Sequence, residues 1–118
     1  MFTVTKQFHF SASHIIVGVP AEHPCGRLHG HNYIVELVLS AETLDPIGFV
    51  VDYNDLKPFQ ALIDRELDHR HLNDVLPGST SAEALAYYLF QKARPLWPQL
   101  VAVRVSETPK TWAEYRPG

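Results

Sequence analysis

The sequence predicts an α+β fold in which two helices cover one face of a four-stranded antiparallel sheet. Apolar and polar residues alternate strictly near both ends of the chain, which is the pattern of strands with one exposed face. In the second half, two stretches instead repeat their apolar residues every three or four positions, as amphipathic helices do. The resulting order of strands, two helices and a final strand is typical of helices layered on an antiparallel sheet.

Four strands are expected. The first is "FTVTKQFHF", residues 2–10, and the second is "HNYIVELVLS", residues 31–40, which places His31 on the apolar face. The turn "DPIG" precedes a short third strand, "FVVDY", residues 49–53. The last strand is "LVAVRVSE", residues 100–107.

Two helices lie between the third and fourth strands. Asp52 or Asn54 can cap a helix over residues 55–67, with Pro58 in its first turn, where a missing N–H donor costs least. The segment "TSAE", residues 80–83, fits a capping box and begins a second helix, which ends before the next proline.

So small a sheet leaves two open edges. Its strands also carry more β-branched surface than two helices can cover. Association of several chains through their sheet edges would pair the open edges and cover the remaining surface, so the sequence predicts an oligomer.

The composition describes one soluble domain over residues 1–118. The apolar share of 46% is that of a globular protein, and a net charge of −3 with mixed signs argues against a nucleic-acid surface. No apolar run is long enough to span a bilayer, and the N-terminus lacks the pattern of a signal peptide. A single cysteine allows no internal disulfide. We therefore expect a cytoplasmic protein that binds neither nucleic acid nor membrane.

The segment "EHPCGRLHGHNY", residues 22–33, concentrates the reactive side chains. His29 and His31 are two residues apart, so both rings share one face of an extended chain and could supply two ligands of a tetrahedral zinc site. His14, at the end of the first strand, is the best third ligand, whereas His9 is expected to be exposed. Ordinary surface histidines are the alternative.

Cys25 precedes this histidine pair by four positions. It could be a small buried apolar residue, which is the usual fate of a free cysteine. Its proline and glycine neighbours favour a surface loop, where a thiolate could act as a general base. It could also be a fourth zinc ligand in a closed structural site. Sequence alone leaves these alternatives open.

Two further positions carry carboxylates of interest. In "LDHRHLN", residues 67–73, Asp68 could orient the imidazole of His69 at a helix end, although a polar helix terminus explains the same residues. Glu107 continues the apolar face of the last strand and needs a partner if it is buried. That partner could be an arginine or a ligand with two adjacent N–H donors, such as a 2-amino-4-oxopyrimidine edge. Alternatively, the side chain emerges into solvent.

Several short motifs occur together and in one order: "FSASH", "CGRLHGHNY", "DYNDLK", "LDHRHLN", "TSAE" and "VRVSET". In this combination the chain resembles the 6-pyruvoyltetrahydropterin synthase family over nearly its whole length. It is most similar to the bacterial branch of 6-carboxy-5,6,7,8-tetrahydropterin synthases of 7-deazapurine (queuosine) biosynthesis. The three residues between Cys25 and His29 match that branch, because the pyruvoyl-forming branch typically has a longer gap.

The resemblance implies a tunnelling fold (T-fold), in which sheets of three subunits form a barrel and two such rings make a homohexamer with sites between subunits. It implies conversion of 7,8-dihydroneopterin triphosphate to 6-carboxy-5,6,7,8-tetrahydropterin with release of acetaldehyde and triphosphate. The implied site residues are zinc ligands His14, His29 and His31, the general base Cys25, the relay of Asp68 with His69, and the substrate contacts Glu107, Thr80, Ser81 and Arg27.

The chain departs from the family in two places. Thr80, Ser81 and Ala84 stand where members often have Pro, Thr and Asn, and Ser81 keeps a hydroxyl for the helix cap and for a hydrogen bond to a ligand. His71 occupies a variable position and receives no role. Two alternatives are a 6-pyruvoyltetrahydropterin synthase or a pterin side-chain lyase of the same fold. A third, from another class, is a non-catalytic protein with a structural zinc site.

Overall fold

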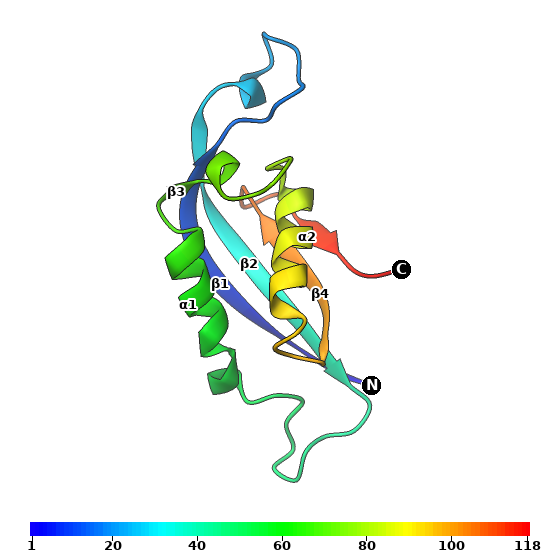
Figure 1. Cartoon of the computed structure of the whole chain (residues 1–118). Coiled ribbons are helices and arrows are strands. Elements are labelled where there is room, and N and C mark those ends of the chain that lie inside the picture. The colour runs from blue at the N-terminus through cyan, green and yellow to red at the C-terminus, as the bar shows by residue number, and fades with distance from the viewer.

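The structure, a computed structural model, describes residues 1–118. Two helices lie over one face of a single twisted sheet, and the molecule is elongated, measuring 55 × 28 × 25 Å (Figure 1). The strands are β1 (Phe2–His14), β2 (His29–Ala41), β3 (Arg70–His71), β4 (Leu100–Ser106) and β5 (Ala113–Tyr115), and the α-helices are α1 (Lys57–Glu66) and α2 (Ala82–Ala93).

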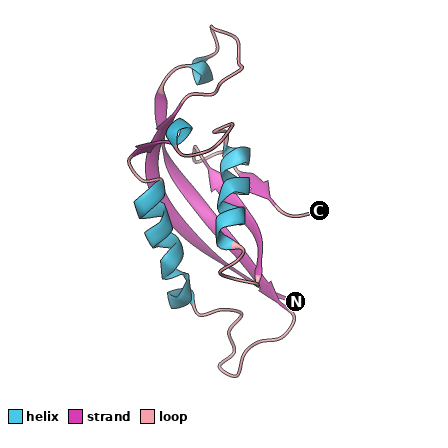
Figure 2. Ribbon diagram, viewed as in Figure 1, coloured by secondary structure: helices cyan, strands magenta, loops and turns pink.

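The sheet has the order β3-β1-β2-β4-β5 and is mixed (Figure 2). Its long strands β1, β2 and β4 pair antiparallel, as the alternation of their residues predicts. The short β3 pairs with β1 in parallel, and the short β5 pairs antiparallel with β4. Neither short strand was predicted, because segments of two and three residues are too brief to show a period. The α+β class is confirmed.

Burial follows the predicted faces of the strands. Alternate residues of β1 and β2 are buried under the helices, including Phe8 and Phe10 on β1 and Tyr33 on β2. His9, on the opposite face of β1, is exposed as expected. The core continues into α1 and α2 through Phe59 and many aliphatic side chains. The sheet and its helices thus form one core beneath one face of the sheet.

The predicted strand over 49–53 is wrong. Its N-terminal end leaves a turn in which the Asp45 side chain accepts the N–H groups of Ile47, Gly48 and Phe49. At the other end the Asp52 side chain caps a 3₁₀ turn, Tyr53–Leu56. These two turns occupy both ends of the segment, and residues 49–53 pair with no strand of the sheet.

Both predicted helices exist with shifted starts. The first helix begins with the 3₁₀ turn that Asp52 caps and continues as α1, with Pro58 in the first α-helical turn as predicted. The N-cap of α2 is Ser81, whose hydroxyl accepts the N–H of Ala84. The capping box over 80–83 is therefore wrong by one residue: Thr80 is buried, and its hydroxyl donates to the carbonyl of Ile15.

Candidate metal centre and active site

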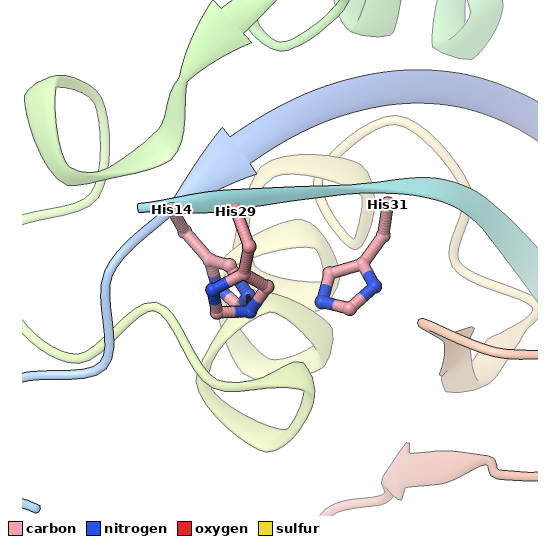
Figure 3. A group of neighbouring side chains, drawn as sticks. All are labelled: His14, His29 and His31. Atoms are coloured by element: carbon pink, nitrogen blue, oxygen red, sulfur yellow. Dashed lines mark hydrogen bonds between the residues drawn. The ribbon is translucent and has the colours of Figure 1, made fainter. Parts of the chain in front are cut away.

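The pairing of β1 with β2 brings the three histidines together. His14 lies opposite His29 and Ala12 lies opposite His31, so both pairs project from the buried face of the sheet. The ligand atoms of His14, His29 and His31 lie within 4.8 Å of one another. Figure 3 shows the three rings on one side of these strands, close enough to share an ion. The predicted grouping of the three histidines is confirmed.

A glycine lies between the two candidate ligands on β2, where the two strands approach closely. A side chain at Gly30 would place a Cβ 3.2 Å from the carbonyl oxygen of Ala12 on the neighbouring strand. That contact is tighter than ordinary packing, so a larger residue would push β2 away from β1. The HGH motif therefore combines two candidate metal ligands with a close approach of β2 to β1 beside His14.

Backbone carbonyls fix the tautomers of two rings. The Nδ1 of His14 lies 2.8 Å from the carbonyl oxygen of Thr80, and the Nδ1 of His29 lies 2.6 Å from that of Arg27. Each Nδ1 therefore carries the proton and donates it. The Nε2 atoms of His14 and His29 then face each other at 2.9 Å with their lone pairs. Such outer-shell carbonyls orient metal-binding histidines in proteins.

The third ring has a free nitrogen. The Nε2 of His31 is buried and has no hydrogen-bond partner, and the Glu107 carboxylate lies 3.6 Å away, beyond hydrogen-bond distance. Burial lowers the pKa of His31, Glu107 opposes that shift, and the two neighbouring histidines add to it. Two facing lone pairs and one unpartnered nitrogen are what a cation would satisfy, so this group fits zinc with three protein ligands and an open position.

Glu107 follows β4 and turns inward, as the parity of the strand predicts. Its side chain is 25% exposed and reaches the histidine group. No arginine pairs with it, so its partners within the chain are His31 and, through its charge, Tyr33. The Tyr33 hydroxyl is buried without a partner, and burial followed by the charge of Glu107 raises its pKa.

Cys25 lies in a 3₁₀ turn, Pro24–Gly26, on the loop that extends beyond the end of β1 and β2 (Figure 1). It is half-buried and unpaired. Its carbonyl accepts the N–H of Ile16, which ties the two arms of the loop together. Its sulfur is outside the group of convergent ligand atoms. Arg27 on the same loop is exposed and contributes its carbonyl to His29.

The side chains of Asp68 and His69 are paired at the end of α1. The Nδ1 of His69 lies 3.0 Å from Asp68, and the side chain of His69 is 82% exposed. Asp68 also accepts the N–H of Ser11, and that bond, followed by His69, lowers the pKa of Asp68. His69 has a φ of 58°, a left-handed conformation uncommon outside glycine. The predicted orientation of His69 by Asp68 is present in the structure.

The Asp68–His69 pair and the metal ligands are not joined by any hydrogen bond or ion pair within the chain. His69 borders a shallow depression of about 460 Å³ that is also lined by His31, Ser11, Asn32 and His71. Ser11 and Asn32 lie on the strand face opposite to His14, because they alternate with the buried residues. His31 therefore adjoins both this depression and the histidine group, whereas His14 and His29 do not line the depression.

Two residues of the site, Asn73 and Tyr33, and one backbone contact, from Thr80, were not predicted. Asn73 holds the end of β1 by accepting the N–H of Ile15 and donating to its carbonyl. Thr80 orients His14 through its backbone carbonyl. Tyr33 lies two residues after His31 on the same face, and this alternation in "HGHNY" was the signal available in the sequence. The backbone contacts could not be predicted, because every residue type carries the same carbonyl group.

None of the helices has the length and apolar content that a membrane-spanning segment needs.

Comparison with known proteins agrees with this geometry. The family model described as 6-pyruvoyl tetrahydropterin synthase matches residues 3–118. The 6-carboxy-5,6,7,8-tetrahydropterin synthase of Bacillus subtilis is 32% identical, over 98% of this chain and 86% of that protein. The enzyme of the same name from Haemophilus influenzae is 25% identical, over 98% and 99%. The structure of Caenorhabditis elegans 6-pyruvoyl tetrahydropterin synthase superposes with a TM-score of 0.86 at 27% identity, covering 99% of this chain and 96% of that one. The chain has the T-fold and belongs to the 6-pyruvoyl tetrahydropterin synthase family.

Proposed function

We propose that this protein is a zinc-dependent 6-carboxy-5,6,7,8-tetrahydropterin synthase of 7-deazapurine (queuosine) biosynthesis. It would convert 7,8-dihydroneopterin triphosphate to the 6-carboxy product with release of acetaldehyde and triphosphate, which makes it a lyase. The observation that carries the proposal is the group of three histidines with aligned lone pairs beside the Glu107 carboxylate. The similarity to the Bacillus subtilis enzyme and the spacing between Cys25 and His29 favour the carboxy product.

His14, His29 and His31 would hold the zinc. When bound, zinc acts as a Lewis acid that lowers the pKa of coordinated substrate hydroxyls. Because Cys25 is outside the group of convergent ligand atoms, three protein ligands leave one position for substrate. This arrangement supports a catalytic site over a closed structural site with four ligands.

The protein groups would divide the remaining work. Glu107 would accept the 2-amino and N3–H donors of the pterin, and Thr80 with Ser81 would border the same ring. Cys25 would remove a proton from the substrate side chain as a thiolate. His69, held in one tautomer by Asp68, would return protons from its Nε2. Arg27 would contact the triphosphate.

We further propose that the protein acts as a homohexamer of two stacked trimers, with each active site between subunits. The structure has no hydrogen bond or ion pair between the Asp68–His69 pair and the three histidines, and of these histidines only His31 lines the depression that His69 borders; this supports a site completed by a second subunit. The long exposed edge of β1, covered by β3 only at Ala12 and Ser13, offers unpaired backbone for such association.

The test is the product formed from 7,8-dihydroneopterin triphosphate by the zinc-loaded protein, measured by mass spectrometry and by trapping acetaldehyde. The proposal expects a carboxypterin and acetaldehyde, both lost in Cys25→Ala. A pyruvoyl product without acetaldehyde would assign the chain to the sister activity. No turnover by folded, zinc-loaded protein would reject the reaction. A chelator should abolish turnover and leave the apo-protein folded, whereas a structural zinc site would unfold.

A further inference from the structure

Tyr33 carries a hydroxyl that the fold does not use. The residue is fully buried, and its ring stacks on Phe10 with centroids 4.8 Å apart and planes inclined by 10°. Its hydroxyl has no hydrogen-bond partner in the chain. A buried polar group without a partner destabilises the fold, and phenylalanine would fill the same space without that cost. The hydroxyl therefore requires an explanation beyond packing.

The second unpartnered buried polar atom is close by. It is the Nε2 of His31, whose ring centroid lies 5.4 Å from that of Tyr33. Elsewhere the buried side-chain polar atoms find partners. Two adjacent exceptions indicate a polar site whose hydrogen bonding is completed by groups from outside the chain or by a rearrangement within it.

The sheet register brings Glu107 to the same place. Ile34 pairs with Ser106 and Val35 pairs with Val105, so one further step of this register sets Glu107 opposite Tyr33. Residues directly opposite in an antiparallel pair project from the same face. From that position the Glu107 carboxylate reaches diagonally to the Nε2 of His31 at 3.6 Å.

We propose that the Tyr33 hydroxyl is a positioning group that donates a hydrogen bond to the Glu107 carboxylate when His31 binds metal. A ring nitrogen that ligates a metal cannot also donate to a carboxylate. Metal binding would therefore commit the Nε2 of His31, the side-chain nitrogen 3.6 Å from Glu107, and the unused donor on the same face of the sheet is the Tyr33 hydroxyl. The hydrogen bond would hold one carboxylate oxygen and aim the other at the pterin. This inference rests on the proposed function for the identity of the ligand.

The effect of Tyr33→Phe should appear in substrate binding. A hydrogen bond to a charged group accounts for about a 10- to 100-fold change in binding. We expect the KM for 7,8-dihydroneopterin triphosphate, and the dissociation constant for unsubstituted pterin, to rise by about that factor, with kcat within about threefold. In a Glu107→Gln background, adding Tyr33→Phe should have little further effect. An undiminished effect of Tyr33→Phe in that background would overturn the proposal.

A matched control is Tyr88→Phe. The Tyr88 hydroxyl donates to Glu66 at 3.2 Å, in a contact between the two helices. Removing it should lower the stability of the apo-protein to urea and leave KM unchanged. Tyr33→Phe should show the opposite pattern, with apo stability equal to or above that of the wild type. A loss of stability with Tyr33→Phe as large as that with Tyr88→Phe would reveal a structural partner and overturn the inference.

A crystal structure of the zinc-loaded protein separates this inference from the proposed function. It should show the Tyr33 hydroxyl oxygen within about 3.0 Å of a Glu107 carboxylate oxygen. A hydroxyl bonded to another group would overturn the inference even if the enzyme makes the expected product. Conversely, absence of turnover and of pterin binding would reject the proposed function, while the crystal structure and the apo stabilities would still decide the role of Tyr33.

Discussion

The histidine group and the Asp68–His69 pair differ in how completely one chain builds them. The ring of His14 is fully buried, and the rings of His14 and His29 are fixed by backbone carbonyls. The ring of His69 is 82% exposed and is held only by Asp68. The first region is ready to bind an ion. The second exposes an imidazole, oriented by Asp68, to a ligand or to another subunit.

The difference follows from local structure. The metal ligands sit on two long paired strands, where the register leaves little freedom. His69 instead occupies a left-handed turn after α1, and such a conformation costs about 1–2 kcal/mol in a residue other than glycine. Ser11 holds the turn by donating its N–H to Asp68 and accepting the N–H of His69. Strain retained at an exposed histidine is consistent with a role in proton transfer.

The largest expected effect concerns the exposed region. His69→Ala should lower kcat by about 10²–10⁴, the range for loss of a general acid or base, with zinc content and fold unchanged. His71→Ala is the control, because its Nδ1 is bonded to Ser13 and it has no assigned role. Steady-state kinetics with metal analysis measures both. A kcat of His69→Ala within threefold of the wild type would remove His69 from the relay.

Mixing variants would show whether the two regions meet between subunits. His69→Ala and His29→Ala are each expected to be inactive. If Asp68 and His69 act on the metal centre of another copy, refolding the two variants together should restore part of the turnover. Persistent inactivity of verified mixed oligomers would place both regions in the same subunit's site.

The next effect concerns the buried region. His14→Ala should weaken zinc binding by more than about 100-fold, since loss of an outer-shell partner alone costs 10- to 100-fold. His9→Ala removes an exposed histidine from the opposite face of β1 and should leave zinc binding unchanged. Titration against a competing chelator measures both affinities. Equal affinities of His14→Ala and the wild type would contradict the ligand assignment.

Sequence patterns could predict the buried region better than the exposed one. Alternation in β1 and β2 defined the faces, and pairing of the two strands then predicted that His14, at the end of the first, would lie beside the start of the second; the register that sets His14 opposite His29 came from the structure. The strand over 49–53 failed because the side chains of Asp45 and Asp52 form turns that override the β-propensity of Phe49 and Val50. The carbonyls that orient the rings, at Thr80 and Arg27, are backbone groups and carry no residue signature.

The contacts of Asp68 also predict a pH dependence of stability. The Ser11 N–H and His69 lower its pKa below the ordinary value of 3.8. A carboxyl whose pKa is lower in the folded state stabilises the fold fully above that ordinary value, and its contribution disappears as the pH falls below about 4. The difference in urea midpoint between the wild type and Asp68→Asn should therefore be largest at pH 5–6 and shrink toward pH 3. Asp74→Asn, at an exposed carboxylate without such donors, should show no comparable trend.

The smallest effect concerns the cap of α2, which adjoins the metal centre. Ser81→Ala removes the acceptor for the N–H of Ala84 and should lower the free energy of unfolding by about 1 kcal/mol. Ser81→Asp keeps an acceptor and should retain most of that stability. Zinc affinity should stay unchanged in both variants. The Thr80 carbonyl accepts the hydrogen bond of His14, and Thr80 is itself held by the bond from its hydroxyl to the carbonyl of Ile15, which does not involve Ser81. If Ser81→Ala weakened zinc binding as well, the orientation of His14 would depend on the helix cap. The pairing of β1 with β2 would then not be enough to position the three histidines.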